Sequence, residues 1–445
     1  MESVLIKAAQ LILSLSLLVI LHEFGHFMFA RLFKTRVEKF YLFFDPWFSL
    51  FKTKKGETEY GIGWLPLGGY VKISGMIDES MDKEAMKQPP QDYEFRSKKT
   101  WQRLLIMIGG VSMNFIFALI IYIGVLYVWG ETYLPTENAK YGIVVVDEAG
   151  EQIGLQTGDK IISVDHRKVE NFYKVIPTVL LDKAKTIQVE RDGKQLDVEI
   201  SDDDIAVLVK AKSVMEPRFL FEFRAAKFAK ESVAEQAGLQ KGDEIISVDS
   251  QEFVYYDQFQ KYLKNHSNES ILLRVVRDRD TLNIPVRLNE TGLLGIHPEA
   301  PVRSNFEYKT IRYGFFESIP AGIQKGFTTI QDYLKQFKLI FSPKTKAYES
   351  LGGFIAIGNI FPGAWNWYAF WTMTAFLSII LAVMNLLPIP ALDGGHVMFL
   401  VFEMVTGRKP GEKFLEYAQI TGMIILLTLV LYANGNDIFK LFAGK

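Results

Sequence analysis

The chain has 445 residues, of which 49% are hydrophobic, 13% aromatic and 23% charged. This mixture predicts lipid-buried segments combined with sizeable water-facing domains. The formal net charge of -1 argues against nucleic acid as a partner. The absence of cysteine excludes disulfides, thiolate ligands and cysteine-based catalysis.

Apolar runs that can cross a hydrocarbon layer of about 30 Å occur at four places. They are residues 4–33, 104–129, 367–387 with a continuation to about 405, and 416–433. The first run exceeds the ~7–15 residues of a signal-peptide core and lacks an A-x-A-like cleavage site. We therefore expect a polytopic α-helical membrane protein with about four transmembrane helices, the first of them retained.

The first predicted span contains the sequence LHEFGHF, residues 21–27. A helix presents the rings of His22 and His26 on one face, because they lie four residues apart, and Glu23 follows the first ring. Ionisable groups inside a span are costly unless they find partners. The HExxH pattern supplies one, since two neutral imidazoles bind zinc and the carboxylate deprotonates a metal-bound water. We predict zinc on His22 and His26 and a catalytic Glu23; a chance match is the alternative.

An internal repeat lies between the second and third predicted spans. EQIGLQTGDKIISVD at 151–165 and EQAGLQKGDEIISVD at 235–249 agree at 12 of 15 positions, with an offset of 84 residues. Such a period suits a duplicated domain. Each copy resembles the A-x-x-A-G-L-x-x-G-D-x-I core of PDZ domains, which are α/β and mainly β; a generic turn and strand is the alternative. PDZ domains bind chain ends at a sheet edge, so a peptide or chain end is a predicted partner.

Apolar residues recur every three or four positions between 323 and 341, which predicts an amphipathic helix. They are Ile323, Phe327, Ile330, Leu334, Phe337 and Phe341. Two interpretations stay open. The helix lies on the outer membrane surface, in contact with lipid, and gates access, or it packs on the PDZ-like pair.

The third apolar run contains a segment that is unusual for a lipid-facing helix, NLLPIPALDGGHVMF at 385–399. Two prolines and two glycines break the helix, and Asp393 is an acid at membrane depth. Broken backbone is tolerated there only when it is buried in protein or lines a wet cavity. Since catalytic zinc commonly has three protein ligands, we favour Asp393 as the third, with His396 as a competing candidate.

Basic residues flank the predicted spans in three clusters, which predicts that these flanks face the cytoplasm. The clusters are Arg31, Lys34, Arg36 and Lys39; Arg96, Lys98, Lys99 and Arg103; and Arg408, Lys409 and Lys413. Residues 130–365 then face outward, and HEFGH lies in the half of its span nearer the cytoplasm.

HEFGH in a first span, a later N-x-x-P-x-P-x-LDGGH segment and paired PDZ-like repeats together resemble the site-2 protease family of intramembrane metalloproteases, in its bacterial RseP-type subgroup. The resemblance implies one zinc ion on His22, His26 and Asp393, with Glu23 as general base and acid. It also implies that Asn385 binds substrate.

Two further stretches are similar to the same family. YGIGWLPLGGYVKISG at 60–75 resembles its re-entrant β-hairpin loop. An edge strand there would hold an unwound substrate by main-chain hydrogen bonds; an ordinary surface hairpin is the alternative. The glycines implied in substrate binding are Gly61, Gly63, Gly68 and Gly69. GGVSMNF at 109–115 resembles a G-P-x-x-N-F signature in which Val111 replaces proline, and Asn114 is expected to hydrogen-bond between helices.

The predicted organisation is two spans with the hairpin at 1–129, PDZ-like domains at 130–215 and 216–300, a linker at 301–365 and two spans at 366–445. The resemblance implies cleavage of single-pass membrane proteins within their transmembrane segments, either an anti-sigma factor after a first external cut or remnant signal peptides. The implied location is the bacterial inner membrane, with the PDZ-like pair outside. A zinc transporter and a non-catalytic PDZ scaffold are the rival functions; the first predicts repeated transmembrane halves or more spans.

Overall fold

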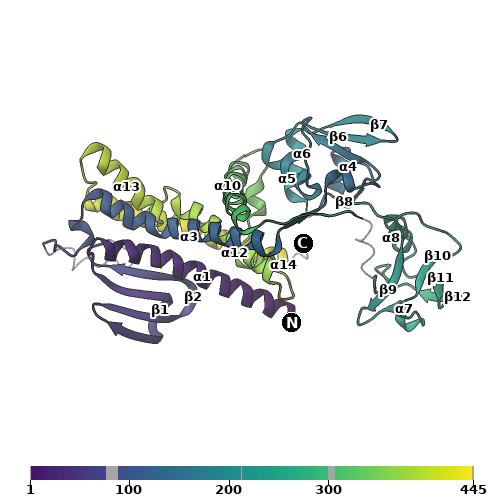
Figure 1. Ribbon diagram of the computed structural model, residues 1–445, viewed down its shortest axis with the longest axis horizontal. Helices are drawn as coiled ribbons and strands as arrows, with labels where there is room; N and C mark the ends of the chain where they lie inside the picture. Colours follow the sequence, from purple (N-terminus) through teal and green to yellow (C-terminus); the bar gives the residue numbers. More distant parts are fainter. Residues whose placement is uncertain (1, 77–88, 212, 299–305, 443–445) are drawn as a thin grey trace. The chain divides into compact units, whose positions relative to one another are not determined.

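The computed structural model describes residues 2–76, 89–211, 213–298 and 306–442 (Figure 1). The chain divides into two compact units. A helical unit comprises Met1–Gly130, Arg312–Phe337 and Leu351–Lys445, and a mainly β unit comprises Glu131–Ile311 and Lys338–Ser350. The predicted domain boundary at residue 300 falls in 299–305, outside the described residues.

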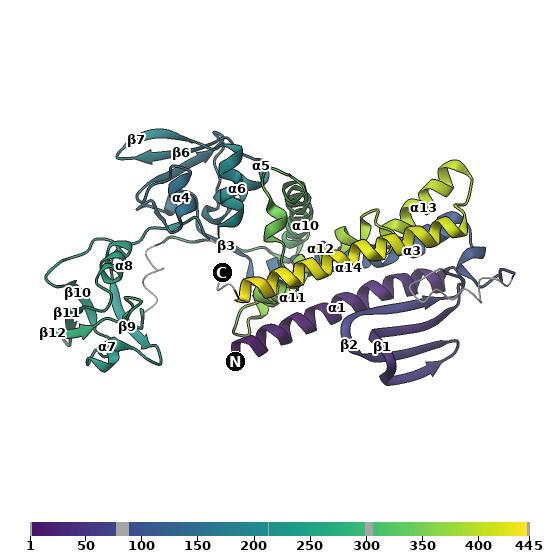
Figure 2. The same cartoon turned by 180° about the vertical axis from the view of Figure 1, so that it is seen from behind.

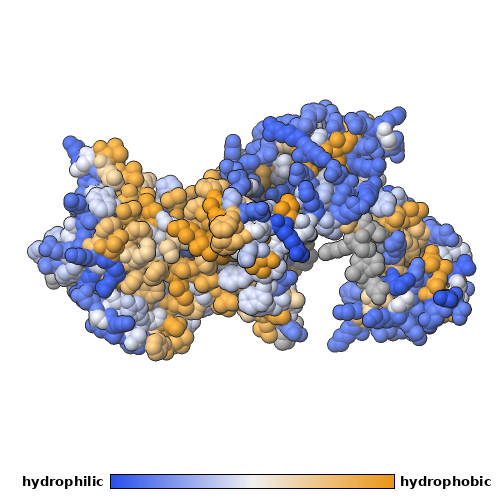
Figure 3. Space-filling model, viewed as in Figure 1, coloured by the Kyte–Doolittle hydropathy of each residue, from blue (hydrophilic) through white to orange (hydrophobic). Residues whose placement is uncertain are grey.

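Within the described residues, four helices of the first unit are long and apolar enough to cross a membrane, as predicted. They are α1 (Glu2–Leu32), α3 (Thr100–Trp129), α12 (Trp367–Leu386) and α14 (Glu412–Phe442). Three further helices accompany them: α10 (Phe315–Ile340), α11 (Phe354–Asn359) and α13 (Asp393–Thr406). Helix α14 runs along the face of this unit seen in Figure 2, and hydrophobic side chains cover the helices in Figure 3.

Helices α1 and α3 touch through their backbones. A Cβ atom added at Gly25 would lie 2.2 Å from the carbonyl oxygen of Gly109. Small residues allow such close approach between spanning helices. Polar side chains join α12 to both helices, because the Thr374 hydroxyl donates to Ser14 Oγ (3.0 Å) and the Ser378 hydroxyl donates to the Asn114 carbonyl (2.7 Å).

An antiparallel sheet of β1 (Val37–Lys55) and β2 (Thr58–Ile73) follows α1 in the chain. Each strand bends back on itself, so its two halves occupy different positions in the sheet. Leu42 therefore pairs with Gly69 on one side and with Ile62 on the other, and Ile62 in turn also pairs with Phe51. Residues 69–73 therefore form an edge of this sheet, whereas 61–62 lie in its interior. The sequence analysis did not predict β1, which is the partner of the predicted 60–75 segment.

The β unit contains two copies of one arrangement, and each copy has its own buried apolar core. In the first copy β5, β6 and β7 form one sheet and β4 pairs with β8; in the second the strand order is β12-β11-β10-β9-β13. The first copy comprises β4 (Ile143–Val145), α4 (Glu148–Gln152), β5 (Lys160–Val164), α5 (Val175–Asp182), β6 (Thr186–Arg191), β7 (Lys194–Glu199), α6 (Asp202–Lys210) and β8 (Met215–Pro217). The second comprises β9 (Phe223–Phe228), α7 (Val233–Gln236), β10 (Glu244–Val248), α8 (Tyr256–Asn265), β11 (Ser270–Arg277), β12 (Asp280–Arg287) and β13 (Ile296–Pro298). Strands β3 (Glu131–Tyr133) and β14 (Lys309–Ile311) pair with each other.

An ion pair between a buried aspartate and a partly exposed arginine occurs at equivalent positions of the two copies. Arg191 donates from Nε and Nη2 to Asp159 at 2.7 and 2.8 Å, and Arg277 does the same to Asp243 at 2.7 and 2.6 Å. Both acids precede the strand that ends the repeated sequence. The matching two-point contacts show that the sequence repeat is a structural duplication.

Helix α10 contains the predicted apolar stripe except for Phe341, which follows the end of the helix. Within the helical unit, Gly322 and Gly326 pack against Ile123 and Leu119 of α3. The last residues of α10 belong to the β unit, where Leu339 is buried in the core of the first copy. Residues up to Phe337 therefore pack within the helical unit, against the candidate spanning helix α3, and Leu339 packs within the β unit.

Candidate metal centre

Helix α1 presents the first candidate ligands. His22 and His26 lie one turn apart on the face that packs against α3, with only 8% and 5% of their surface exposed. The Gly25–Gly109 contact brings the α3 backbone against both rings, and a Cβ at Gly110 would lie 2.4 Å from Nε2 of His26. Glycine at 110 is therefore required for the rings to approach α3.

The third candidate ligand begins a new helix. Helix α12 ends at Leu386 and α13 starts at Asp393, so residues 387–392 break the third apolar run, as the prolines predict. This break folds back onto the first turn of α13, where a Cβ at Gly394 would lie 2.1 Å from the Leu387 carbonyl oxygen. The two glycines after Asp393 permit this turn, which places the carboxylate beside α1.

Three donor atoms converge on one point. Oδ2 of Asp393 lies 3.1 Å from Nε2 of His22 and 3.3 Å from Nε2 of His26, and the two nitrogens are 3.3 Å apart. A tetrahedral zinc site with bonds of about 2.0–2.1 Å has ligand–ligand edges of about 3.3–3.4 Å. Oδ2 is buried and has no hydrogen-bond partner among the described residues. The donor set therefore fits a zinc ion, and His396 does not join this cluster.

Groups around the ligands fix their orientation. Nδ1 of His26 lies 2.8 Å from the Ile106 carbonyl oxygen, an acceptor that holds the ring proton on Nδ1 and leaves Nε2 free. Asn114 lies beside Nδ1 of His22, as expected of an interhelical partner, and the Asn385 amide nitrogen is 3.4 Å from Nε2 of His22. Ile106 and Gly110 were not predicted as site residues, although the Gly-Gly pair at 109–110 indicates close helix approach.

A cavity of about 210 Å³ opens over the three candidate ligands. Glu23, Asn385, Gly69 and Tyr70 line it. A Cβ at Gly69 would lie 3.6 Å from Cγ of Glu23, so the sheet edge runs directly past the predicted base.

The other predicted glycines lie elsewhere in the sheet. Gly61 packs against the Tyr41 ring, Gly63 against the backbone of Phe44, and Gly68 against the Phe44 ring. The structure therefore brings Gly69 to the site together with Asn385, and it places Gly61 and Gly63 away from the edge.

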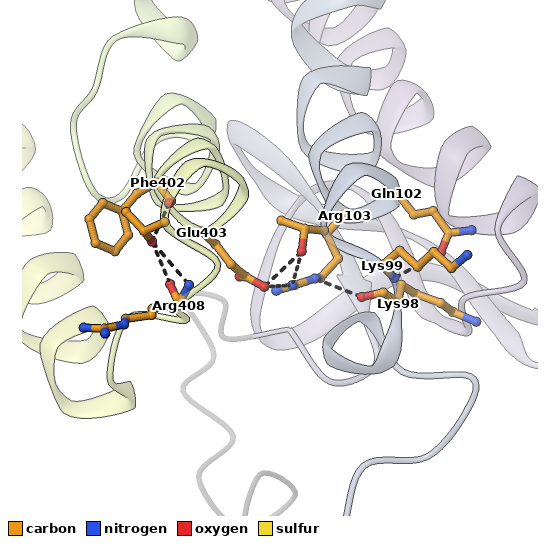
Figure 4. Close-up of polar contacts among 9 residues, drawn as sticks. Lys98, Lys99, Gln102, Arg103, Phe402, Glu403 and Arg408 are labelled. Atoms are coloured by element: carbon orange, nitrogen blue, oxygen red, sulfur yellow. Dashed lines mark hydrogen bonds and ion pairs between the residues drawn. The ribbon is translucent and has the colours of Figure 1, made fainter.

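A second cavity, of about 440 Å³, shares Met76, Ala391, His396 and Gln419 with the first. Its wall includes a buried ion pair between Arg103 of α3 and Glu403 of α13, with side chains 9% and 10% exposed (Figure 4). The same Glu403 oxygen accepts from the Thr100 hydroxyl at 3.0 Å. This pair fastens α13, the helix that begins with Asp393, to α3.

The site combines two histidines and a neighbouring glutamate on a candidate spanning helix with an aspartate at the start of α13, all around one cavity. Such a site among candidate spans is typical of metallopeptidases that act inside the membrane, and the fold and site place this protein in that class. Residues 10–429 match the family described as peptidase family M50, and the chain belongs to that family. It is a site-2-type zinc metalloprotease, as the sequence predicted.

Relatives match along nearly the whole chain. The regulator of sigma E protease of Haemophilus influenzae is 30% identical over 452 residues, covering 97% of this chain and 98% of that protein. RseP of Escherichia coli K12 is 28% identical over 463 residues (99% and 100%), and a putative zinc metalloprotease of Rickettsia conorii is 28% identical over 438 residues (97% and 98%). With its candidate spans and these bacterial relatives, the chain is a bacterial inner-membrane protein.

Proposed function

We propose that this protease cleaves single-pass membrane proteins within their transmembrane segments, using one zinc ion held by His22, His26 and Asp393. The observation that carries the proposal is the convergence of these three donor atoms, two on the candidate spanning helix α1 and one at the start of α13. When bound, zinc supplies Lewis acidity that polarises the scissile carbonyl and acidifies water. Glu23 takes the proton of the attacking water and delivers it to the leaving amide nitrogen.

The substrate is held as an extended strand along the free edge formed by residues 69–73. Strand addition at this edge satisfies the main-chain groups of a segment that has unwound from its helix. Gly69 keeps the edge free of a side chain beside Glu23, and the Asn385 amide, at the other side of the cavity, binds the substrate backbone. Both sheet and cavity lie in the helical unit, so this unit contains the whole cleavage site.

The duplicated β domains act as PDZ modules, and the second copy is the one suited to a chain end. A groove of about 560 Å³ lies between α8 and the segment 291–297. Gly292 and Gly295 have positive φ there and shape the loop TGLLG before the edge strand β13. The corresponding sequence before β8 is KAKSV, without glycine. We further infer that the pair excludes substrates that carry bulky outer domains.

The relatives named for the regulation of sigma E suggest the substrate class: a membrane-anchored anti-sigma factor that has first been cut outside the membrane. Remnant signal peptides are a second class with the same single apolar segment. The basic clusters favour a cytoplasmic position for the flanks of the site and an outer position for residues 130–365.

Substrate identity is tested by comparing membrane fragments in cells that carry the wild-type enzyme or Glu23→Gln. We expect single-span fragments to accumulate only in the variant, because the metal ligands remain but the base is lost. The Thr374→Val variant, altered in the same helical unit away from the cavity, is the control and should match wild type. Equal fragment lists in all three strains would contradict the proposal.

A further inference from the structure

The Nδ1 atom of His22 faces Asn114, and their contact decides which proton the ring carries. His22 turns Nε2 toward Asp393 and His26. A neutral imidazole can offer an Nε2 lone pair only when its proton is on Nδ1, which then needs an acceptor. Asn114 is completely buried, and its amide group lies 3.2 Å from Nδ1.

The amide nitrogen of Asn114 faces Nδ1, so two donors oppose each other when Nδ1 carries the proton that metal binding at Nε2 requires. Its Oδ1 is buried and has no hydrogen-bond partner among the described residues. Oxygen and nitrogen of a side-chain amide occupy nearly the same volume, so a half-turn of the group is sterically permitted. That turn replaces the donor–donor conflict by a hydrogen bond from Nδ1–H to Oδ1.

We propose that Asn114 is a positioning residue: it accepts a hydrogen bond from Nδ1–H of His22 and so keeps the Nε2 lone pair available to the metal ion. The inference rests on the proposed ligand role of His22. Its counterpart is the Ile106 carbonyl, an acceptor at 2.8 Å from Nδ1 of His26. Ser378 of α12 donates to the Asn114 carbonyl at 2.7 Å and fixes this residue from a third helix.

The experiment measures the zinc affinity of the purified full-length protein by competition with a chromophoric chelator. Asn114→Leu, similar in shape but without an acceptor, should bind zinc about 10–100-fold more weakly than wild type. Asn114→Asp should bind at least as tightly as wild type, because a carboxylate accepts from Nδ1–H and cannot donate. Thr374→Val removes another fully buried interhelical hydrogen bond and should leave affinity unchanged.

Zinc binding by Asn114→Leu as tight as that of Thr374→Val would overturn the proposal. Equal weakening in Asn114→Asp and Asn114→Leu would also overturn it, since an acceptor would not be what His22 needs. Thermal unfolding of each variant in detergent checks the fold, and if Asn114→Asp is not recovered folded, Asn114→Leu against Thr374→Val decides. Full zinc retention by His22→Ala would instead refute the ligand set, so the two failures are distinguishable.

Discussion

Replacing Gly110 by alanine tests the packing that builds the metal centre. The new methyl carbon would lie 2.4 Å from Nε2 of His26 and 2.8 Å from Nε2 of His22. It would therefore occupy the space next to both nitrogens, where a shared metal ion belongs. Alanine has a better helix propensity than glycine by about 1 kcal/mol, so a loss cannot come from the helix itself.

The size of the effect follows from the overlap. Carbon and nitrogen atoms in ordinary contact are about 3.5 Å apart, so the His26 ring must retreat by about 1 Å. Metal sites tolerate ligand displacements of about 0.2 Å. Since loss of a single outer-shell partner already costs about 10–100-fold in metal affinity, we expect Gly110→Ala to lose at least about 100-fold and to be inactive.

The assay is zinc affinity by chelator competition, with Gly124→Ala as the matched control. Gly124 lies in the same helix, and a Cβ there would have no heavy atom within 4 Å. Gly124→Ala should bind zinc as wild type does. Equal affinities of Gly110→Ala and Gly124→Ala would refute the placement of α3 against the ligands.

The remaining predictions concern stability. Glu403→Ala leaves the Arg103 charge buried without its partner and should lower the free energy of unfolding by about 3–5 kcal/mol. The double variant Arg103→Met with Glu403→Met should recover most of this stability. Thermal unfolding that shows the double variant to be as unstable as the single one would contradict this prediction. Burial alone would raise the pKa of Asp243, but hydrogen bonds from Arg277 and the Gln240 amide outweigh it and lower the pKa below its ordinary 3.8. Asp243 therefore stabilises the second β domain above pH 3.8, and this contribution is lost as the pH falls through the lowered pKa. Protection factors of the β10 and β11 amides, which correct the exchange rates for their intrinsic pH dependence, should fall in that acid range for wild type and show no such step in Asp243→Asn. Identical pH profiles would disprove the role of the pair.

Local spacing was enough to predict which three side chains, His22, His26 and Asp393, lie together. His22 and His26 are related by one helical turn, and Asp393 stands out as an acid after two prolines, so each signal is contained in a short window of sequence. The number of candidate spans follows equally from apolar length. The duplication is readable because the two copies retain the same acids and turns.

Features that depend on contacts between distant segments were not predictable. Gly110 lies against the histidines because of the register in which α1 packs on α3, and this register cannot be predicted from the sequence of either helix alone. Gly61 and Gly63 were expected at a substrate edge, but β1 folds over and covers both sides of residues 61–62. Strand β1 was not predicted because its apolar and polar residues do not alternate strictly. Of Gly61, Gly63 and Gly69, the structure places only Gly69 beside Glu23.

The most direct test of the account uses purified wild-type and Glu23→Gln protein, reconstituted with a single-pass substrate. Zinc content is measured together with the position of any cut, by mass spectrometry. We expect one zinc ion per chain in both proteins and cleavage inside the apolar segment of the substrate by the wild type alone. Cleavage by Glu23→Gln at the wild-type rate, or cuts confined to segments outside the membrane, would contradict it.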